Sequence, residues 1–219
     1  HTENITMVLE DTLKKANMTM DDIDAIAVTY SPGLMGSLLV GVECAKALSF
    51  VYNKPLIAVN HIAGHIYANN FEKNMEYPLL ALVVSGGHTD LIMMHGDYKF
   101  EHIGGTLDDA IGECYDKVAR VLDLKYPGGP NVEKLALEGE YTYDLPIPMN
   151  DDSFNMSFSG LKSSIINLEK KKKQRGNEIR RADLAHSFQT VAVDQLVRKT
   201  ELAINKYGVK KMIIAGGVS

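Results

Sequence analysis

The stretch LLALVVSGGHTDLIMMHGDYKFEHI, residues 79–103, decides the fold class of this chain. It holds three short strand-like runs, LLALVVS, TDLIMM and YKFEHI, and two turn signals, Gly86-Gly87 and His95-Gly96-Asp97, separate them. Runs of this length joined by glycine-containing turns are typical of neighbouring antiparallel strands. We therefore expect a β-meander in the middle of the chain.

Helices and strands alternate before this meander. Apolar residues recur at helical spacing over 5–16, and AIAVT (25–29) reads as a short buried strand. A second helix is predicted to extend to Tyr52. We place its start at Ser31-Pro32-Gly33, because proline is favoured in the first turn of a helix. LIAV (56–59) is the expected second strand.

Helices return after the meander. They are predicted over 106–122, 131–138, 159–170 and 182–207, and KMIIAGG (211–217) closes the sequence as a strand. Thr106 and Asp109 have the spacing of a capping box. Mixed strands and helices of this kind predict an α/β fold with two lobes. The pattern changes near NMEYP (74–78), so we expect one lobe over 1–76 and another over 77–219.

The composition excludes several classes of protein. Hydrophobic residues make up 45% of the 219 and charged residues 23%, which is typical of a globular chain and not of a disordered, collagen-like or coiled-coil one. The cysteines, Cys44 and Cys114, have no Cys-x-x-Cys spacing, which fits a reducing compartment. We find no signal peptide and no apolar run that reaches the roughly 18 residues of a membrane span. The cytoplasm is the predicted location.

The net charge of −5 gives no general signature of nucleic-acid binding. One segment, 162–181, nevertheless concentrates eight basic residues against two acidic ones. Such a run is either a solvated helix end or a place where a phosphate backbone docks.

A histidine pair in NHIAGH (60–65) is the first candidate for chemistry. His61 and His65 are four residues apart, which on a helix places both imidazoles on one face as a two-point metal clamp. A zinc protease would need a glutamate beside the first histidine to act as general base. Ile62 stands there, so metal-assisted proteolysis is disfavoured.

Glycine-rich turns are the second group of candidates. In VVSGGHTDL (83–91) the backbone around Gly86-Gly87 can approach an anion closely, although the same pair also suits an ordinary hairpin. YPGGPNVEKLA (126–136) is a rigid turn before a helix. In IIAGGVS (213–219) a strand ends in Gly-Gly, which either places its backbone against a flat base or sugar or simply turns the strand into a loop.

Carboxylates of the predicted 106–122 helix form the third group. On a continuous helix a single stripe would hold Asp109, Glu113, Asp116 and Arg120. Because three carboxylates on one stripe repel one another, hydroxyl or amine groups of a ligand would explain them better than open solvent.

Together and in this order, these strings resemble the tRNA threonylcarbamoyladenosine synthase family, the bacterial TsaD family once labelled O-sialoglycoprotein endopeptidase or glycoprotease. The matching strings are SPGLMGSLLVGVECAKAL, NHIAGHIYA, VVSGGHTDL, DDAIGECYDKVAR, YPGGPNVEKLA, SFSGLKSS, SFQTVAVDQLV and IIAGGVS. They run through nearly the whole chain, and no single one would justify the comparison.

The resemblance implies an actin-like fold of the ribonuclease H-like (ASKHA) kind, with two lobes and incomplete here at both termini. It implies transfer of the threonylcarbamoyl group from threonylcarbamoyl-AMP to N6 of the adenosine 3′ of the tRNA anticodon. It makes His61 and His65 ligands of one divalent ion, iron or zinc. Its implied substrate-binding residues are Val84, Ser85, Gly86, Gly87, His88, Asp116, Gly129 and Glu133.

The resemblance also implies elements outside this sequence. These are an N-terminal strand before His1, and an asparagine for the nucleotide and an aspartate for the metal after Ser219. The implied partners are tRNA and two further subunits, one TsaB-like and one TsaE-like. No association with a membrane is implied. No general base is assigned. The alternatives left open are an actin-fold ATPase or sugar kinase, a metalloprotease, and a non-catalytic subunit of the same complex.

Overall fold

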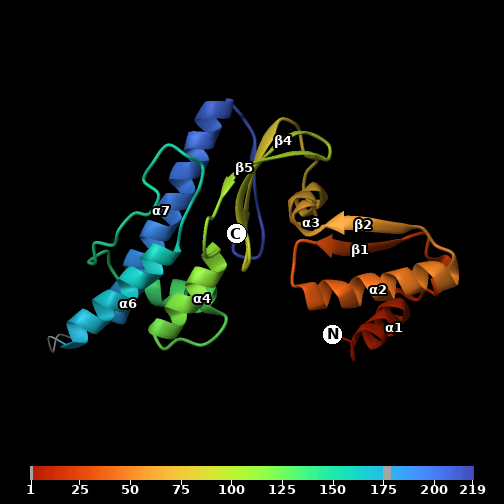
Figure 1. Cartoon of the computed structure of the whole chain (residues 1–219), viewed down its shortest axis with the longest axis horizontal. Helices are drawn as coiled ribbons and strands as arrows, with labels where there is room; N and C mark the ends of the chain where they lie inside the picture. The colour runs from red at the N-terminus through yellow and green to blue at the C-terminus, as the bar shows by residue number, and fades with distance from the viewer. Residues whose placement is uncertain (1, 175–178) are drawn as a thin grey trace. The chain divides into compact units, whose positions relative to one another are not determined.

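The structure, a computed structural model, describes residues 2–174 and 179–219, without the side chains of 172–174. The chain forms two compact units, His1–Tyr67 and Ala68–Ser219 (Figure 1). The mixed α/β architecture predicted from the sequence is confirmed. The lobes proposed over 1–76 and 77–219 stay a prediction.

The first unit is built on a strand–helix–strand motif. Strand β1 (Ile26–Ser31) runs parallel to β2 (Leu56–Asn60), with Ile26 opposite Leu56 and Thr29 opposite Val59. Helix α2 (Met35–Tyr52) connects them, because parallel strands need a crossover. Helix α1 (Ile5–Ala16) and a short 3₁₀ turn (Met20–Asp22) precede the motif, and α3 (His61–Tyr67) follows it.

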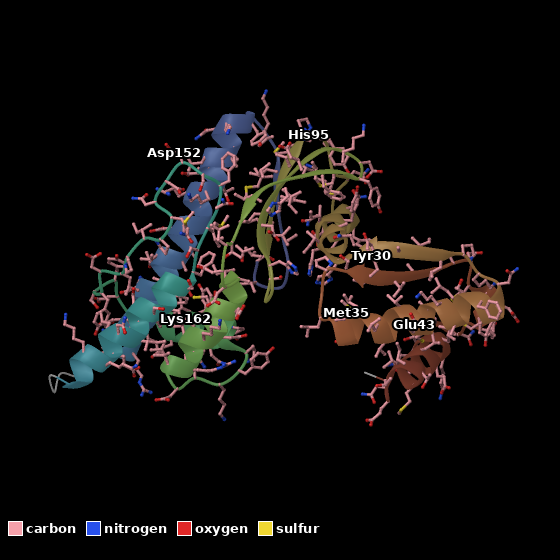
Figure 2. The ribbon with its side chains drawn as sticks, in the orientation of Figure 1. Tyr30, Met35, Glu43, His95, Asp152 and Lys162 are labelled. Carbon is pink, nitrogen blue, oxygen red and sulfur yellow. The ribbon has the colours of Figure 1, made fainter. Side chains whose placement is uncertain are left out.

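Helix α2 is apolar, and its residues are exposed or half-buried except for the buried Ala45. Its 18 residues have a mean hydropathy of 1.3, so by length and composition it could cross a bilayer. It includes Met35, which is exposed, and Glu43, which pairs with Lys46 at 2.8 Å (Figure 2). Length and composition alone do not separate a membrane span from an apolar helix of a soluble protein.

The second unit contains the predicted meander. After a 3₁₀ turn (Ala68–Phe71), β3 (Leu79–Val84), β4 (Thr89–Gly96) and β5 (Lys99–Gly105) pair antiparallel. Strand β6 (Met212–Ala215) then pairs parallel with β3, which gives the order β5-β4-β3-β6. Every residue of the central strand β3 is buried.

The described residues of this unit also form the helices α4 (Ile111–Val121), α5 (Gly128–Ala136), α6 (Ser159–Gln174) and α7 (Arg181–Tyr207). Alternate residues of β3 (Leu80, Leu82 and Val84) share one core with α4 and α7. Phe188 of α7 packs edge-on to Tyr115 of α4, with ring centroids 4.9 Å apart. This core fixes the sheet ends relative to α4 and α7.

The predicted start of the 106–122 helix is wrong. Helix α4 begins at Ile111, because the preceding residues form a loop with its own partners. The Thr106 hydroxyl donates to the backbone oxygen of Asp109 at 2.7 Å, and the backbone of Leu107 donates to Met156 at 2.9 Å. The capping-box spacing therefore marks a loop and not a helix N-terminus.

Candidate functional site

The histidine pair is positioned by a cap at the end of β2. The side-chain oxygen of Asn60 accepts hydrogen bonds from the backbone N–H groups of Ile62 (2.9 Å) and Ala63 (3.2 Å). This satisfies two of the donors that a helix N-terminus leaves open and starts α3 directly after the strand. His61 and His65 then fall one turn apart on that helix.

The two imidazoles converge as the spacing predicts. Their Nε2 atoms are 3.1 Å apart, and the ring planes cross at 66°. Two nitrogens bound to one tetrahedral zinc lie about 3.3 Å apart, given bonds of about 2.0–2.1 Å. The pair therefore fits two ligands of one ion. Within the described residues no cluster of three or more histidine, cysteine or acidic side chains completes such a site.

The glycine turn between β3 and β4 is closed by its own flanking residues. The backbone N–H of Ser85 donates to His88 O at 2.8 Å, and the backbone of His88 donates to the Ser85 hydroxyl at 3.0 Å. Neither Gly86 nor Gly87 has a positive φ, and no other atom lies within 4 Å of where their Cβ atoms would be. The space over this turn is open to a ligand.

Helix α4 starts directly against this turn. The buried Thr89 hydroxyl accepts the backbone N–H of Ile111 at 2.9 Å. Gly112 follows, and a Cβ there would lie 2.8 Å from both Gly86 Cα and Ser85 O. A glycine is therefore required for the helix to approach the turn.

A pocket of about 680 Å³ opens beside the turn, which is within the usual size of small-molecule sites. Its walls come from the glycine turn, the first turns of α4 and α5, the middle of α7 and the loop after β6. Its lining residues are Gly86, Gly112, Tyr115, Asp116, Tyr126, Pro127, Gly129, Pro130, Glu133, Gln189, Val193, Gly217, Val218 and Ser219.

Four residues expected from the resemblance line this pocket: Gly86, Asp116, Gly129 and Glu133. Ser85, Gly87 and His88 belong to the turn but not to the lining. Val84 lies in the core, and its carbonyl accepts the backbone N–H of Val218 at 3.1 Å.

Sequence reasoning missed Gln189 and Val193, which α7 contributes to the pocket lining. Both residues lie in SFQTVAVDQLV, one of the strings that match the family, but nothing in that string indicates a pocket, because the packing of α7 against α5 brings them there. Tyr115 and Tyr126 were missed for a similar reason.

The predicted stripe of acidic residues is divided by the real start of α4. Asp109 precedes the helix and pairs with Lys117 at 2.7 Å, as Glu113 does at 2.6 Å. These hydrogen bonds raise the pKa of Lys117. Asp116 alone turns to the pocket, where its carboxylate accepts the backbone N–H of Gly128 at 2.7 Å and so fixes the start of α5.

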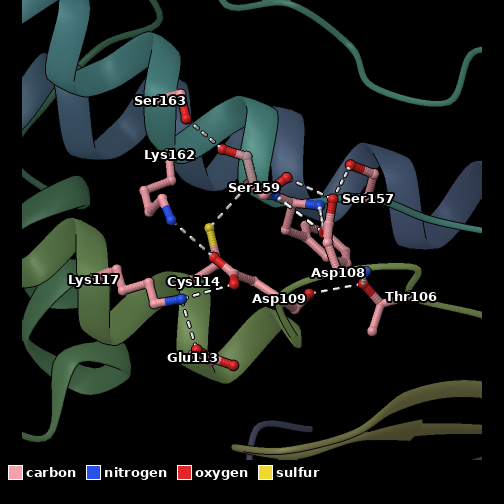
Figure 3. A network of polar contacts seen from close by, with 11 residues as sticks. Thr106, Asp108, Asp109, Glu113, Cys114, Lys117, Ser157, Ser159, Lys162 and Ser163 are labelled. Carbon is pink, nitrogen blue, oxygen red and sulfur yellow. Dashed lines mark hydrogen bonds and ion pairs between the residues drawn. The ribbon is translucent and has the colours of Figure 1, made fainter.

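Asp108 fixes the start of α6, as Asp116 fixes the start of α5 (Figure 3). Its carboxylate accepts hydrogen bonds from the hydroxyls of Ser157 and Ser159, both at 2.6 Å, and from the backbone of Phe158 at 2.8 Å. Burial by itself would raise the pKa of Asp108, but these hydrogen bonds hold it below its ordinary value. Lys162 joins the network through Asp109 at 3.3 Å.

The basic segment is partly neutralised. Lys162 pairs with Asp109, Arg180 with Asp183 at 3.0 Å, and Arg181 with Asp123 at 2.6 Å. The side chains of 172–178 lie outside the described residues, so docking of a phosphate backbone on this segment stays a prediction.

The chain has an actin-like α/β fold, which a solved structure of similar fold supports. The activator of 2-hydroxyisocaproyl-CoA dehydratase from Clostridium difficile, solved with bound ADPNP, has a similar fold. It aligns over 98% of this chain and 66% of its own, with a TM-score of 0.52 and 14% identity. The model of one family, TsaD, described as tRNA N6-adenosine threonylcarbamoyltransferase, matches residues 1–219. The chain belongs to that family.

Curated relatives agree with this assignment. The tRNA N6-adenosine threonylcarbamoyltransferases of Listeria welshimeri and Bacillus cereus are 59% and 57% identical to it over 220 residues. Those alignments cover all of this chain and 64% of each relative. The chain thus spans just under two thirds of the length of the curated relatives it matches.

Proposed function

We propose that the full-length protein transfers the threonylcarbamoyl group from threonylcarbamoyl-AMP to N6 of the adenosine 3′ of the anticodon, in tRNAs reading codons that begin with adenine. The observation that carries this proposal is the match of the whole chain to a family whose curated relatives have that activity in their name. The pocket supports it, because it combines an open glycine turn with acceptor-only carboxylates.

The reaction mainly requires the protein to position its two substrates. The donor is a mixed anhydride, so its carbonyl carbon is already activated. The adenosine N6 attacks that carbon, the bond to the phosphate oxygen breaks, AMP leaves and the amine loses one proton. The protein must hold donor and acceptor in line and stabilise the charge that develops on the carbonyl oxygen.

Pocket residues divide this positioning task. Asp116 and Glu133 carry acceptor-only carboxylates suited to the hydroxyls of a sugar. The Ser85–His88 turn offers an open backbone surface on which a phosphate can rest. Gly129, in the first turn of α5, leaves room for the ligand because nothing lies within 4 Å of its missing Cβ.

His61 and His65 would hold one divalent ion, iron or zinc, through their converging Nε2 atoms. When bound, this ion would supply a Lewis acid. Metal ions bind the neutral form of an imidazole, so each ring would offer one nitrogen lone pair to the ion.

The test uses the full-length protein with both histidines replaced, His61→Ala together with His65→Ala. We expect the bound metal to be lost and the transfer of labelled threonine to tRNA to fall to background. His95→Ala is the matched control, because His95 pairs with Glu101 at 2.7 Å on the β4–β5 hairpin, away from the pocket lining. Full metal content or normal tRNA modification in the double variant would reject the assignment.

The same preparations are assayed for ATP hydrolysis and for cleavage of casein. An actin-fold ATPase or sugar kinase would turn over ATP without forming modified tRNA. A metalloprotease would cleave casein in a histidine-dependent manner. Either result, without transfer to tRNA, would replace the proposed function.

We extend the proposal to partners and location. tRNA is the substrate of the named relatives, and TsaB-like and TsaE-like subunits are the proposed assembly partners. A cytoplasmic location follows from that role. Co-purification of the three subunits with tRNA from the cytosolic fraction is the expected result.

A further inference from the structure

Helices α5 and α7 pack antiparallel beside the pocket, and two contacts fix their register. The ring Nδ1 of His186 donates to Ala136 O at 3.0 Å, and the Asp183 carboxylate accepts the backbone N–H of Glu140 at 3.0 Å. One turn back along α5 from Ala136 is Glu133, and one turn forward along α7 from His186 is Gln189. Glu133 and Gln189 therefore face one another, and both line the pocket.

Gln189 differs from the other polar residues in its part of α7. Ser187 accepts the backbone N–H groups of Thr142 and Tyr143, both at 3.2 Å, and the Gln195 amide donates to Pro148 O at 2.6 Å. Within the described part of the chain, the Gln189 side chain makes no hydrogen bond to any residue. A half-buried amide that lines a pocket and has no partner is available for a ligand.

The chemistry of the two facing side chains separates their roles. The Glu133 carboxylate only accepts hydrogen bonds, which suits hydroxyl groups, whereas the Gln189 amide offers a donor and an acceptor side by side. That pair is complementary to the N6 amino group and the N7 acceptor of adenine. Guanine and hypoxanthine present two acceptors, O6 and N7, along the same edge and cannot satisfy the amide oxygen.

We propose that Gln189 is the residue that selects adenine in this pocket, by a paired hydrogen bond to N6 and N7 of the nucleotide base. This inference rests on the proposed function, because it takes the pocket to be the site of the adenylated donor. Gln189 acts on binding and not on the reacting carbonyl, so it is a specificity-determining residue.

The test measures binding of AMP, IMP and 7-deaza-AMP to the full-length protein by calorimetry. Wild type should prefer AMP to both of the others, because IMP lacks the amino group and 7-deaza-AMP lacks N7. A paired contact of this kind discriminates by about 5- to 150-fold. Gln189→Met, which keeps the side-chain length, should bind the three nucleotides with similar and weaker affinity.

Asp194→Asn is the matched control, since Asp194 is an exposed residue of the same helix outside the pocket lining, and it should keep the wild-type preference. The comparison of AMP with 7-deaza-AMP on the wild type needs no variant, so it holds even if Gln189→Met folds poorly. Equal affinity of the wild type for these two nucleotides, or an unchanged preference in Gln189→Met, overturns the role of Gln189 while AMP binding and transfer to tRNA persist. A wild type that neither binds AMP nor modifies tRNA overturns the proposed function as well.

Discussion

Replacing Gly112 by alanine tests whether the start of α4 and the glycine turn form one rigid unit. The new Cβ would lie 2.8 Å from Gly86 Cα and from Ser85 O, and 3.0 Å from a methyl carbon of Val218. Carbon atoms in contact prefer a separation of about 3.5–4.0 Å, so the turn and the helix must separate by roughly 0.7 Å or more. The Val218 side chain can move aside, but the two atoms at 2.8 Å belong to backbone.

Overpacking of this kind costs about 1–3 kcal/mol of the free energy of unfolding. A loss of about 2 kcal/mol lowers the melting temperature by roughly 4–8 °C for a chain of about 150–250 residues, and by less for the longer full-length protein. Because Gly86 and Gly112 both line the pocket, AMP affinity should fall together with stability. Urea and thermal denaturation of the full-length protein, with calorimetry of AMP binding, measure the two effects.

Gly160→Ala is the control for this experiment. Gly160 lies in the first turn of α6, and nothing is within 4 Å of its missing Cβ. Alanine is preferred to glycine in helices, so this variant should be as stable as the wild type or slightly more so. The reasoning is refuted if Gly112→Ala unfolds at the wild-type urea concentration and binds AMP normally.

Two further predictions concern the network around α4 and α6. Asp108→Ala should destabilise the protein by about 1–2 kcal/mol at neutral pH, because the start of α6 loses its cap. Since the pKa of Asp108 is lower folded than unfolded, its stabilisation is complete above about pH 4 and is lost as pH falls through the folded pKa. The free energies of unfolding of variant and wild type, measured by urea titration, should therefore converge in acid. A difference between them that does not change with pH would contradict this. For Cys114, burial raises the pKa of the thiol to about 12, so at pH 8 iodoacetamide should leave it unmodified in the native protein and alkylate it after denaturation. Peptide mapping by mass spectrometry locates the label, and rapid native modification of Cys114 would show that the α4 core opens.

Periodicity predicted most of the secondary structure because the amphipathic and buried segments are long and regular. The meander over 79–103 and the long helix over 182–207 have their predicted bounds to within a few residues. The error at 106–110 has a physical cause. Threonine and aspartate cap helices and loops with the same hydrogen bonds, and only the contacts with Met156 and the 157–159 segment decide between them.

The candidate site divides in the same way. His61 and His65 converge because their spacing on a helix is local geometry, which a sequence contains in full. Asp116, Gly129 and Glu133 were named from the resemblance, and the structure brings them to one pocket. Gln189 lies in a matching string, but the resemblance assigns it no role, and its place opposite Glu133 depends on the register of α7 against α5.

What this sequence determined by itself is local: which segments become strands and helices, that two imidazoles meet on α3, and that glycines stand where the backbone must be open. The tertiary structure alone decided that α4 begins at Ile111, that Asp116 faces the pocket while Glu113 pairs with Lys117, and that α7 supplies a wall. The reason is that periodicity records only which face of an element is apolar. The side chains that meet across elements are selected by packing between residues far apart in the chain.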